Sequence, residues 1–258
     1  MVYRYIFSLL VIFSLSCSEI DRDNMLDPKN PSSKRDRVLL LEAFVNTNNP
    51  LPYNNYAIGA INTLSVDDDI QDHLIILEYH RDTQQYADSL KADPLNTENI
   101  YSSYINYDSE RFKGVPDLFL NGAVDRVQGA SSTTNVVNRV KNLAIEQLLD
   151  DGLYTIEVDF DLNGNTINGT YRIARLGNQS SDEMLLRMLI TWNSGDNGKW
   201  SVSKALSPVA VDQISSGKYL EKDFSIPNVP AGRAEKLVLV LTDITGLNVL
   251  HAIEKDIL

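Results

Sequence analysis

The hydrophobic pattern of this 258-residue chain changes its period near Gly152, and that change restricts the folds open to it. Before Gly152, continuous apolar runs such as residues 38–41 alternate with segments whose apolar residues recur every three or four positions. Such runs are typical of strands buried on both faces of an α/β sheet. After it, residues 154–160 alternate strictly between apolar and polar side chains, as half-buried antiparallel strands do. The fold class we predict is α/β plus all-β, with an α/β domain over residues 37–150 and an antiparallel β-sandwich over residues 151–258.

Composition excludes several functions. With 23 basic and 35 acidic residues the net charge is -12, so we expect no nucleic-acid partner, because such proteins need a basic face. One cysteine and three histidines provide no thiol pair, no disulfide and no Cys/His zinc cage. We therefore expect no cofactor and no enzyme activity.

The N-terminus has the layout of a secretory signal. Arg4 precedes an apolar run over residues 6–15, which is too short to span a bilayer, and the run ends at Ser16 and Cys17. The single cysteine stands where a bacterial lipoprotein is cut and lipidated. We predict a lipoprotein signal peptide over residues 1–16, lipid attachment at Cys17 and an outer-membrane location facing the periplasm or the surface. The alternative, that Cys17 is only a small residue of an ordinary signal peptide, stays open.

A polar segment with two prolines follows the cysteine. Residues 17–36 include Pro28 and Pro31 and few apolar side chains, which predicts a flexible tether.

The α/β half has a clear order of elements. We expect a strand over 38–44, a helix over 53–64, a strand over 73–79, a helix over 97–104 capped by Thr97, strands over 117–120 and 123–127 joined by a type I′ turn at Asn121-Gly122, and a helix over 133–149.

This order, with G-x-P before the hairpin, resembles the thioredoxin fold, in which that proline is cis. The resemblance implies a cis bond before Pro116. The segments "LLLEAF", "LEYH", "DPL" and "GVPDLFLNG" further resemble the Omp28-related family of bacterial outer-membrane lipoproteins, in which a thioredoxin-like half precedes a β-sandwich half. The likeness extends over most of residues 37–258.

The chain departs from that family at the redox motif. Members that retain chemistry carry C-x-x-C-P shortly after the "E-F" pair, and counting without gaps places those thiols at Asn49 and Pro52. Neither residue forms a thiolate, so thiol-disulfide exchange is excluded at these vestigial positions. Residues 46–52 are then expected to form a loop that connects the first strand to the helix over 53–64, with Asn48 or Asn49 as the N-cap of that helix.

Further strands of the second half are expected over 170–176, 183–191, 200–206, 219–226, 236–242 and 247–253. Short strands separated by Gly, Asn, Asp and Ser turns favour an Ig-like antiparallel sandwich.

One segment mimics a calcium loop. Asp159, Asp161 and Asn163 occupy the first, third and fifth positions, but the twelfth is Thr170, where a bidentate glutamate is needed. A hairpin turn at Asn163-Gly164 is the preferred interpretation, and we expect no metal.

Three other groups of residues could suggest functional sites, but a structural role is the preferred interpretation of each. His80, with Glu78 and Asp82 nearby, could suggest a metal site, but no second histidine is near, and we expect His80 to end a strand. The run of residues 67–69 is expected to be a solvated loop, and Tyr101, Tyr104 and Tyr107 are expected to pack in a core.

The function we predict is a lipid-anchored cell-envelope protein. Its redox-inactive thioredoxin-like domain would act as a binding or structural module for an unknown protein or glycan partner. Two alternatives stay open: a calcium-dependent adhesin or carbohydrate binder, and a thioredoxin-like enzyme with residual cysteine-independent activity.

Overall fold

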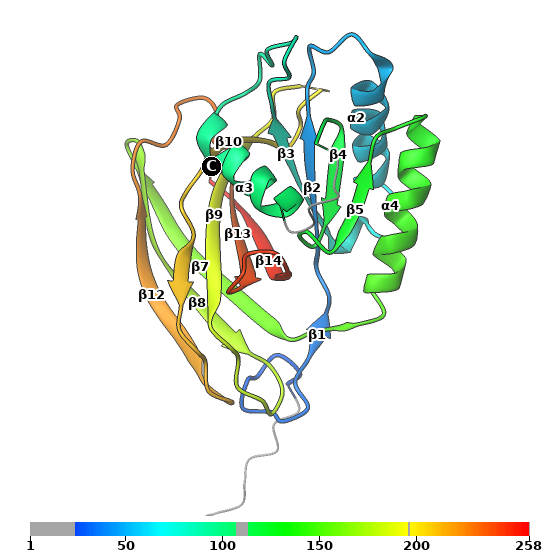
Figure 1. The fold of residues 1–258 in the computed structure, drawn as a ribbon. Helices are drawn as coiled ribbons and strands as arrows, with labels where there is room; N and C mark the ends of the chain where they lie inside the picture. The colour runs from blue at the N-terminus through cyan, green and yellow to red at the C-terminus, as the bar shows by residue number, and fades with distance from the viewer. Residues whose placement is uncertain (1–23, 107–112, 196, 258) are drawn as a thin grey trace, which may run out of the picture.

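A computed structural model describes residues 24–106, 113–195 and 197–257 as a mixed α/β protein made mostly of β-sheet (Figure 1). The expected signal peptide, Cys17 and Tyr107 lie outside the described residues. The main elements in chain order are β1 (Arg35–Asp36), β2 (Leu39–Val45), α2 (Pro52–Leu64), β3 (Leu74–His80), α3 (Pro94–Asn106), β4 (Asp117–Leu120), β5 (Asp125–Gln128), α4 (Thr133–Gln147), β6 (Asp151–Gly152), β7 (Tyr154–Asn163), β8 (Thr166–Arg175), β9 (Met184–Trp192), β10 (Ser201–Ala205), β11 (Val209–Val211), β12 (Tyr219–Ile226), β13 (Lys236–Asp243) and β14 (Val249–Asp256).

The first half of the chain forms four strands in the order β3-β2-β4-β5. β2 runs parallel to β3 and antiparallel to β4. Every residue of β2 is buried because both faces of this sheet are covered. Leu39 and Leu41 pack with α2 and α4 on one face, whereas Leu40 and Phe44 pack with α3 on the other.

The sheet does not end with the first half of the chain. β10 pairs in parallel with β3 through Ser201 and Glu78, and the sheet continues through β9, β13 and β14. The second sheet, β12-β8-β7, packs its apolar face against β9 and β13. The predicted domains 37–150 and 151–258 therefore contribute strands to one sheet.

A buried ion pair also joins the two halves. Glu42 of β2 accepts hydrogen bonds from both terminal nitrogens of Arg187 of β9, at 2.9 and 3.1 Å. Tyr79 and Tyr104 donate their hydroxyls to the same carboxylate, at 3.0 and 2.5 Å. Burial alone would lower the pKa of Arg187, but Glu42 raises it well above its ordinary value, so the guanidinium is charged. Burial is the main cause that raises the pKa of both tyrosines, which keeps their hydroxyls protonated as donors.

Several element boundaries differ from the sequence prediction, and two of the differences have a clear local cause. α3 begins at Pro94, and Thr97 is a buried residue inside it; the cap is Asp93, whose Oδ1 accepts the Asn96 amide at 3.4 Å. β5 begins at Asp125 because Leu120 pairs with Asp125, so the connection has four residues, 121–124, and not the predicted two; Asn121 and Gly122 do have positive φ, but Gly122 bridges to Asn248 of the β13–β14 connection.

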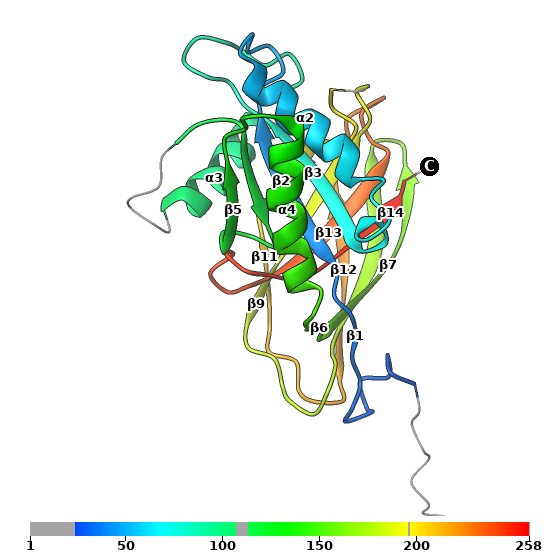
Figure 2. The same ribbon diagram turned by 90° about the vertical axis from the view of Figure 1, so that its right-hand side faces the viewer.

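The prediction of a flexible tether is wrong for residues 24–36. β1 pairs with β6, and Ser33 Oγ accepts the Gly177 amide at 2.7 Å. Backbone hydrogen bonds fold residues 24–34 into consecutive turns, since Asp and Asn side chains next to proline favour turns. This segment lies at the end of the molecule opposite the loop between β2 and α2 (Figures 1 and 2).

Among the described residues, no helix has the length and apolar character needed to cross a bilayer.

Candidate functional site

The loop over residues 46–51 leaves the carboxyl end of β2 and is fixed by hydrogen bonds that are wholly or partly buried. Asn46 is fully buried, and its Nδ2 donates to the carbonyls of Arg81 and Tyr86 at 2.7 and 2.8 Å. Its backbone amide donates to Asn54 Oδ1 at 2.9 Å. The loop is therefore attached both to α2 and to the segment that follows β3.

Asp88 provides a second attachment. Its carboxylate accepts the amide and the hydroxyl of Thr47, each at 2.8 Å. Burial alone would raise the pKa of Asp88, but hydrogen bonds from His80, Leu90 and Thr47 outweigh it and lower that pKa. Asp88 is thus a carboxylate that orders the loop.

His80 lies between Asp88 and Ser201 in a Ser-His-Asp arrangement. Its Nδ1 lies 3.2 Å from Asp88 Oδ2, and its Nε2 lies 2.9 Å from Ser201 Oγ. All three side chains are buried, and Ser201 Oγ also lies 2.9 Å from the Gly198 carbonyl. The hydroxyl of Ser201 is buried, and its contact with His80 joins β10 to β3.

The metal interpretation of His80 receives no support from its neighbours. Asp82 pairs with Lys91 and accepts the Asp88 amide, whereas Glu78 accepts the Trp200 amide at 2.9 Å. Burial raises the pKa of Glu78.

The vestigial thiol positions lie at the start of α2. Pro52 is its first residue, and Leu51 occupies the cap position with no side-chain bond, so the prediction of Asn48 or Asn49 as cap is wrong. Asn49 instead accepts the Leu51 amide at 3.0 Å, in a local turn before the helix. The bond between Val115 and Pro116, predicted to be cis, is cis in the structure.

An open hollow of about 600 Å³ lies beside this loop. Its lining comprises Asn49, Leu51, residues 81–86 and residues 113–115. Arg81 is held there by Glu98 through two bonds of 2.6 Å and stacks over Tyr101 at 3.7 Å. None of the described residues that line the hollow carries a sulfur atom.

The calcium candidates do not converge. Asp159, Asp161 and Asn163 alternate along the exposed face of β7, and Asp159 pairs with Lys255 at 3.1 Å. The central residues of the hairpin are Gly164 and Asn165, one position later than predicted. In residues 24–106, 113–195 and 197–257, no group of three or more His, Cys, Asp or Glu could hold a metal.

The remaining groups lie elsewhere. Residues 67–69 lie in a turn in which Asp68 and Asp69 are exposed, as expected for a solvated loop, and Asp67 and Asp69 pair with Lys141 at 2.8 and 2.7 Å. Tyr101 and Tyr104 lie in the core as expected.

Fold and site together define a mixed α/β protein dominated by β-sheet, with a polar hollow where the parallel strands end. No protein-family model matches the chain, and no curated protein matches it. Among solved structures it is similar to HBP35 of Porphyromonas gingivalis, with a TM-score of 0.64 and 10% identity over 86% of this chain and 76% of that chain. At this identity the likeness shows a shared fold alone.

Two further structures are much less similar. Spo0M from Bacillus subtilis gives a TM-score of 0.29 at 15% identity over 41% of this chain and 49% of its own. A β-glucosidase from Thermotoga neapolitana gives 0.26 at 10% identity over 40% and 16%. Neither carries an argument about this chain.

Proposed function

We propose that this chain is a lipid-anchored cell-envelope protein of the Omp28-related type, in which a thioredoxin-like half without redox chemistry acts as a binding module beside an Ig-like sandwich. The order β2-α2-β3-α3-β4-β5-α4 and the sheet order β3-β2-β4-β5 support the thioredoxin-like assignment. The fold shared with HBP35 supports a single architecture over both halves.

The observation that carries the proposal is the loop between β2 and α2. Asn49 in this loop and Pro52 at the start of α2 correspond to the positions where redox members of the family hold thiols, and hydrogen bonds of Asn46 and Thr47 fix the loop. A fixed polar loop beside an open hollow retains the shape of a binding site without a nucleophile.

The placement of the N-terminal segment is consistent with this role. Residues 24–36 lie at the end of the molecule opposite the hollow, and Cys17 precedes them by a few residues in sequence. A lipid on Cys17 would hold that end at the membrane and leave the hollow facing away from it.

A redox assay on full-length protein tests the first part of the proposal. We expect insulin reduction at the rate of the buffer blank. Asn49→Cys with Pro52→Cys should form a reducible disulfide, because the two positions flank the N-terminus of α2, whereas Asn49→Cys alone should give none. Reduction by the unaltered protein above the blank, or two cysteines that cannot pair, would overturn the assignment.

Anchoring and binding are tested in the native envelope. Mass spectrometry should find a diacylglyceryl group on Cys17, and Cys17→Ala should release soluble protein. A photo-crosslinking residue at Leu51, which is 51% exposed at the hollow, should capture a partner that the same residue at Leu149, 82% exposed elsewhere, does not. Equal capture at both positions would contradict a binding role for the hollow.

A further inference from the structure

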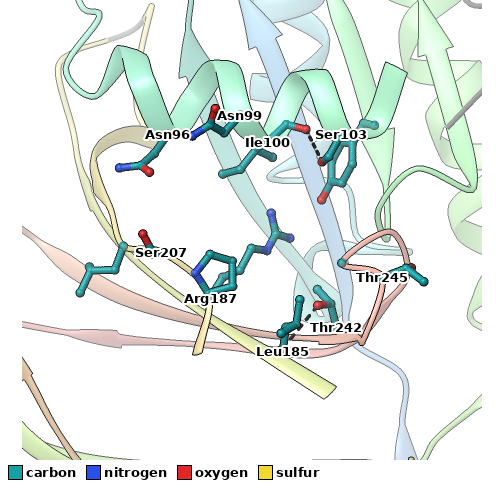
Figure 3. A pocket seen from close by; sticks show the side chains of 13 residues that line it. Asn96, Asn99, Ile100, Ser103, Leu185, Arg187, Ser207, Thr242 and Thr245 are labelled. Carbon is teal, nitrogen blue, oxygen red and sulfur yellow. Dashed lines mark hydrogen bonds between the residues drawn. The ribbon is translucent and has the colours of Figure 1, made fainter. Parts of the chain in front are cut away.

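A second cavity, of about 240 Å³, lies between α3 and the strands β9 and β13, where the two halves of the chain meet (Figure 3). It is separate from the loop at Asn49 and from the residues around that loop. Its volume is somewhat below the roughly 300 to 1,000 Å³ of sites that hold drug-sized ligands, so its occupant is small.

The wall of the cavity is apolar and the rim is polar. Ile100, Leu185 and Leu206 provide aliphatic surface. Asn99 and Ser207 are exposed at the rim, and their side chains make no hydrogen bond within the described part of the chain. A small apolar chamber with a few polar groups is the usual construction of a ligand site.

Arg187 is the one charged residue in the lining that the structure describes. Figure 3 shows its side chain extending from β9 into the space between α3 and the strands. Both of its terminal nitrogens are bound by Glu42, so its charge is compensated. Its Nε is buried and has no hydrogen-bond partner among the described residues. A buried donor without a partner destabilises the folded protein, and an acceptor oxygen would remove that penalty.

We propose that this cavity binds a small uncharged molecule with an apolar body and one carbonyl or hydroxyl oxygen, which accepts a hydrogen bond from Arg187 Nε once a small side-chain movement opens that buried atom to the cavity. The lack of net charge follows from the lining. An anion would compete with Glu42 for a guanidinium that is already paired, and a cation would meet no carboxylate among the lining residues. This inference does not depend on the function proposed for the hollow at Asn49.

Three probes of one shape and different charge test the ligand class: benzamide, benzoate and benzamidine. Binding to full-length protein is followed by saturation-transfer NMR, and the Arg187 Nε–H signal is followed in arginine-labelled protein. We expect benzamide to bind with a Kd on the order of 1 mM, to shift the Nε–H signal, and to bind at least tenfold more tightly than either charged probe.

Two tryptophan substitutions on α3 test the location. Ile100→Trp should fill the cavity and weaken benzamide binding at least tenfold, whereas Leu95→Trp, at a position 70% exposed and outside the lining, should bind like the unaltered protein. Circular dichroism verifies that both variants fold. Tighter binding of benzoate or benzamidine overturns the ligand class. Binding that survives Ile100→Trp, an unmoved Nε–H signal, or no binding of benzamide overturns the site.

Discussion

Glu42 and Arg187 each interrupt a strand that is otherwise almost wholly apolar, "LLLEAFV" for β2 and "MLLRMLITW" for β9. A single charge in such a run is a sequence signal, because a buried charge needs a partner. Their pairing could not be predicted, since the two residues are 145 positions apart and meet only when β9 joins the sheet.

Removing one partner of this pair tests its importance. Glu42→Gln leaves the Arg187 guanidinium buried without a counter-charge, so we expect a loss of about 3 to 5 kcal/mol in the free energy of unfolding, measured with urea. Glu157→Gln is the matched control, because Glu157 is 72% exposed and pairs with Arg172 on the surface. The urea midpoint of the Glu157→Gln variant should equal that of the unaltered protein. Equal effects of the two substitutions would contradict the buried role of Glu42.

We expect His251 to make the stability of the fold depend on pH. Burial first, and then the charge of Arg35, lower its pKa from 6.5 to about 3, and Arg35 Nη1 lies 3.0 Å from His251 Nε2. The unfolded chain therefore binds the proton first. The contribution of His251 is complete above pH 6.5 and is lost as pH falls toward 3, by about 1.4 kcal/mol per pH unit.

The measurement is urea unfolding between pH 7 and pH 4 for the unaltered protein and for His251→Gln. Both proteins share the same carboxylates, so the difference between their curves isolates the histidine. The variant should have the flatter curve, and parallel curves would contradict the lowered pKa.

At the scale of elements, the long periodic segments were predictable and the short ones were not. The helices α2 and α4 follow from residues that recur at helical spacing, and the alternation from Tyr154 predicts β7. β1, β6 and β11 have two or three residues each, too few to show a period. The sequence also does not predict that residues 24–36 pack onto β6, because β1 has only two residues.

In the candidate site, too, the sequence predicts one part and not the other. The position of the loop at residues 46–52 followed from its place between a strand and a helix. Asp88 and Ser201, which hold its surroundings, come from a polar segment and from a strand 121 residues beyond His80. Only the pairing of β3 with β10 brings Ser201 to His80, and no local pattern encodes that pairing.

The connection between β4 and β5 depends on one glycine. Gly122 has φ +94°, and a Cβ there would lie 2.2 Å from the Leu247 carbonyl oxygen. Gly122→Ala should lower the free energy of unfolding by about 2 kcal/mol or more, because the added Cβ clashes and the backbone is strained. Gly164 in the β7–β8 turn also has positive φ, but there is open space around it. Gly164→Ala should therefore lower the free energy of unfolding by about 1 kcal/mol. Urea unfolding of both variants measures the difference; a larger loss at Gly164 would contradict the close contact.

At the scale of the whole molecule, the two halves share a sheet, an ion pair and a core. Leu40, Phe44 and Tyr79 of the first half pack in one cluster with Leu189 and Val240 of the second. The first half could therefore bind a partner without being stable on its own. Separating the halves would expose this cluster and leave Arg187 unpaired.

We accordingly expect full-length protein to unfold in one transition, with coincident near-UV and far-UV circular dichroism curves and equal calorimetric and van't Hoff enthalpies. A fragment of residues 37–150 should lack a near-UV signal and aggregate, because it exposes the edge of β3 and the face of Phe44 and Tyr104 that β9 and β13 normally cover. Glu42→Gln should lower the single transition without splitting it. Two separate transitions, or a fragment with native near-UV bands, would show that each half folds independently and that the shared sheet contributes little to the stability of either.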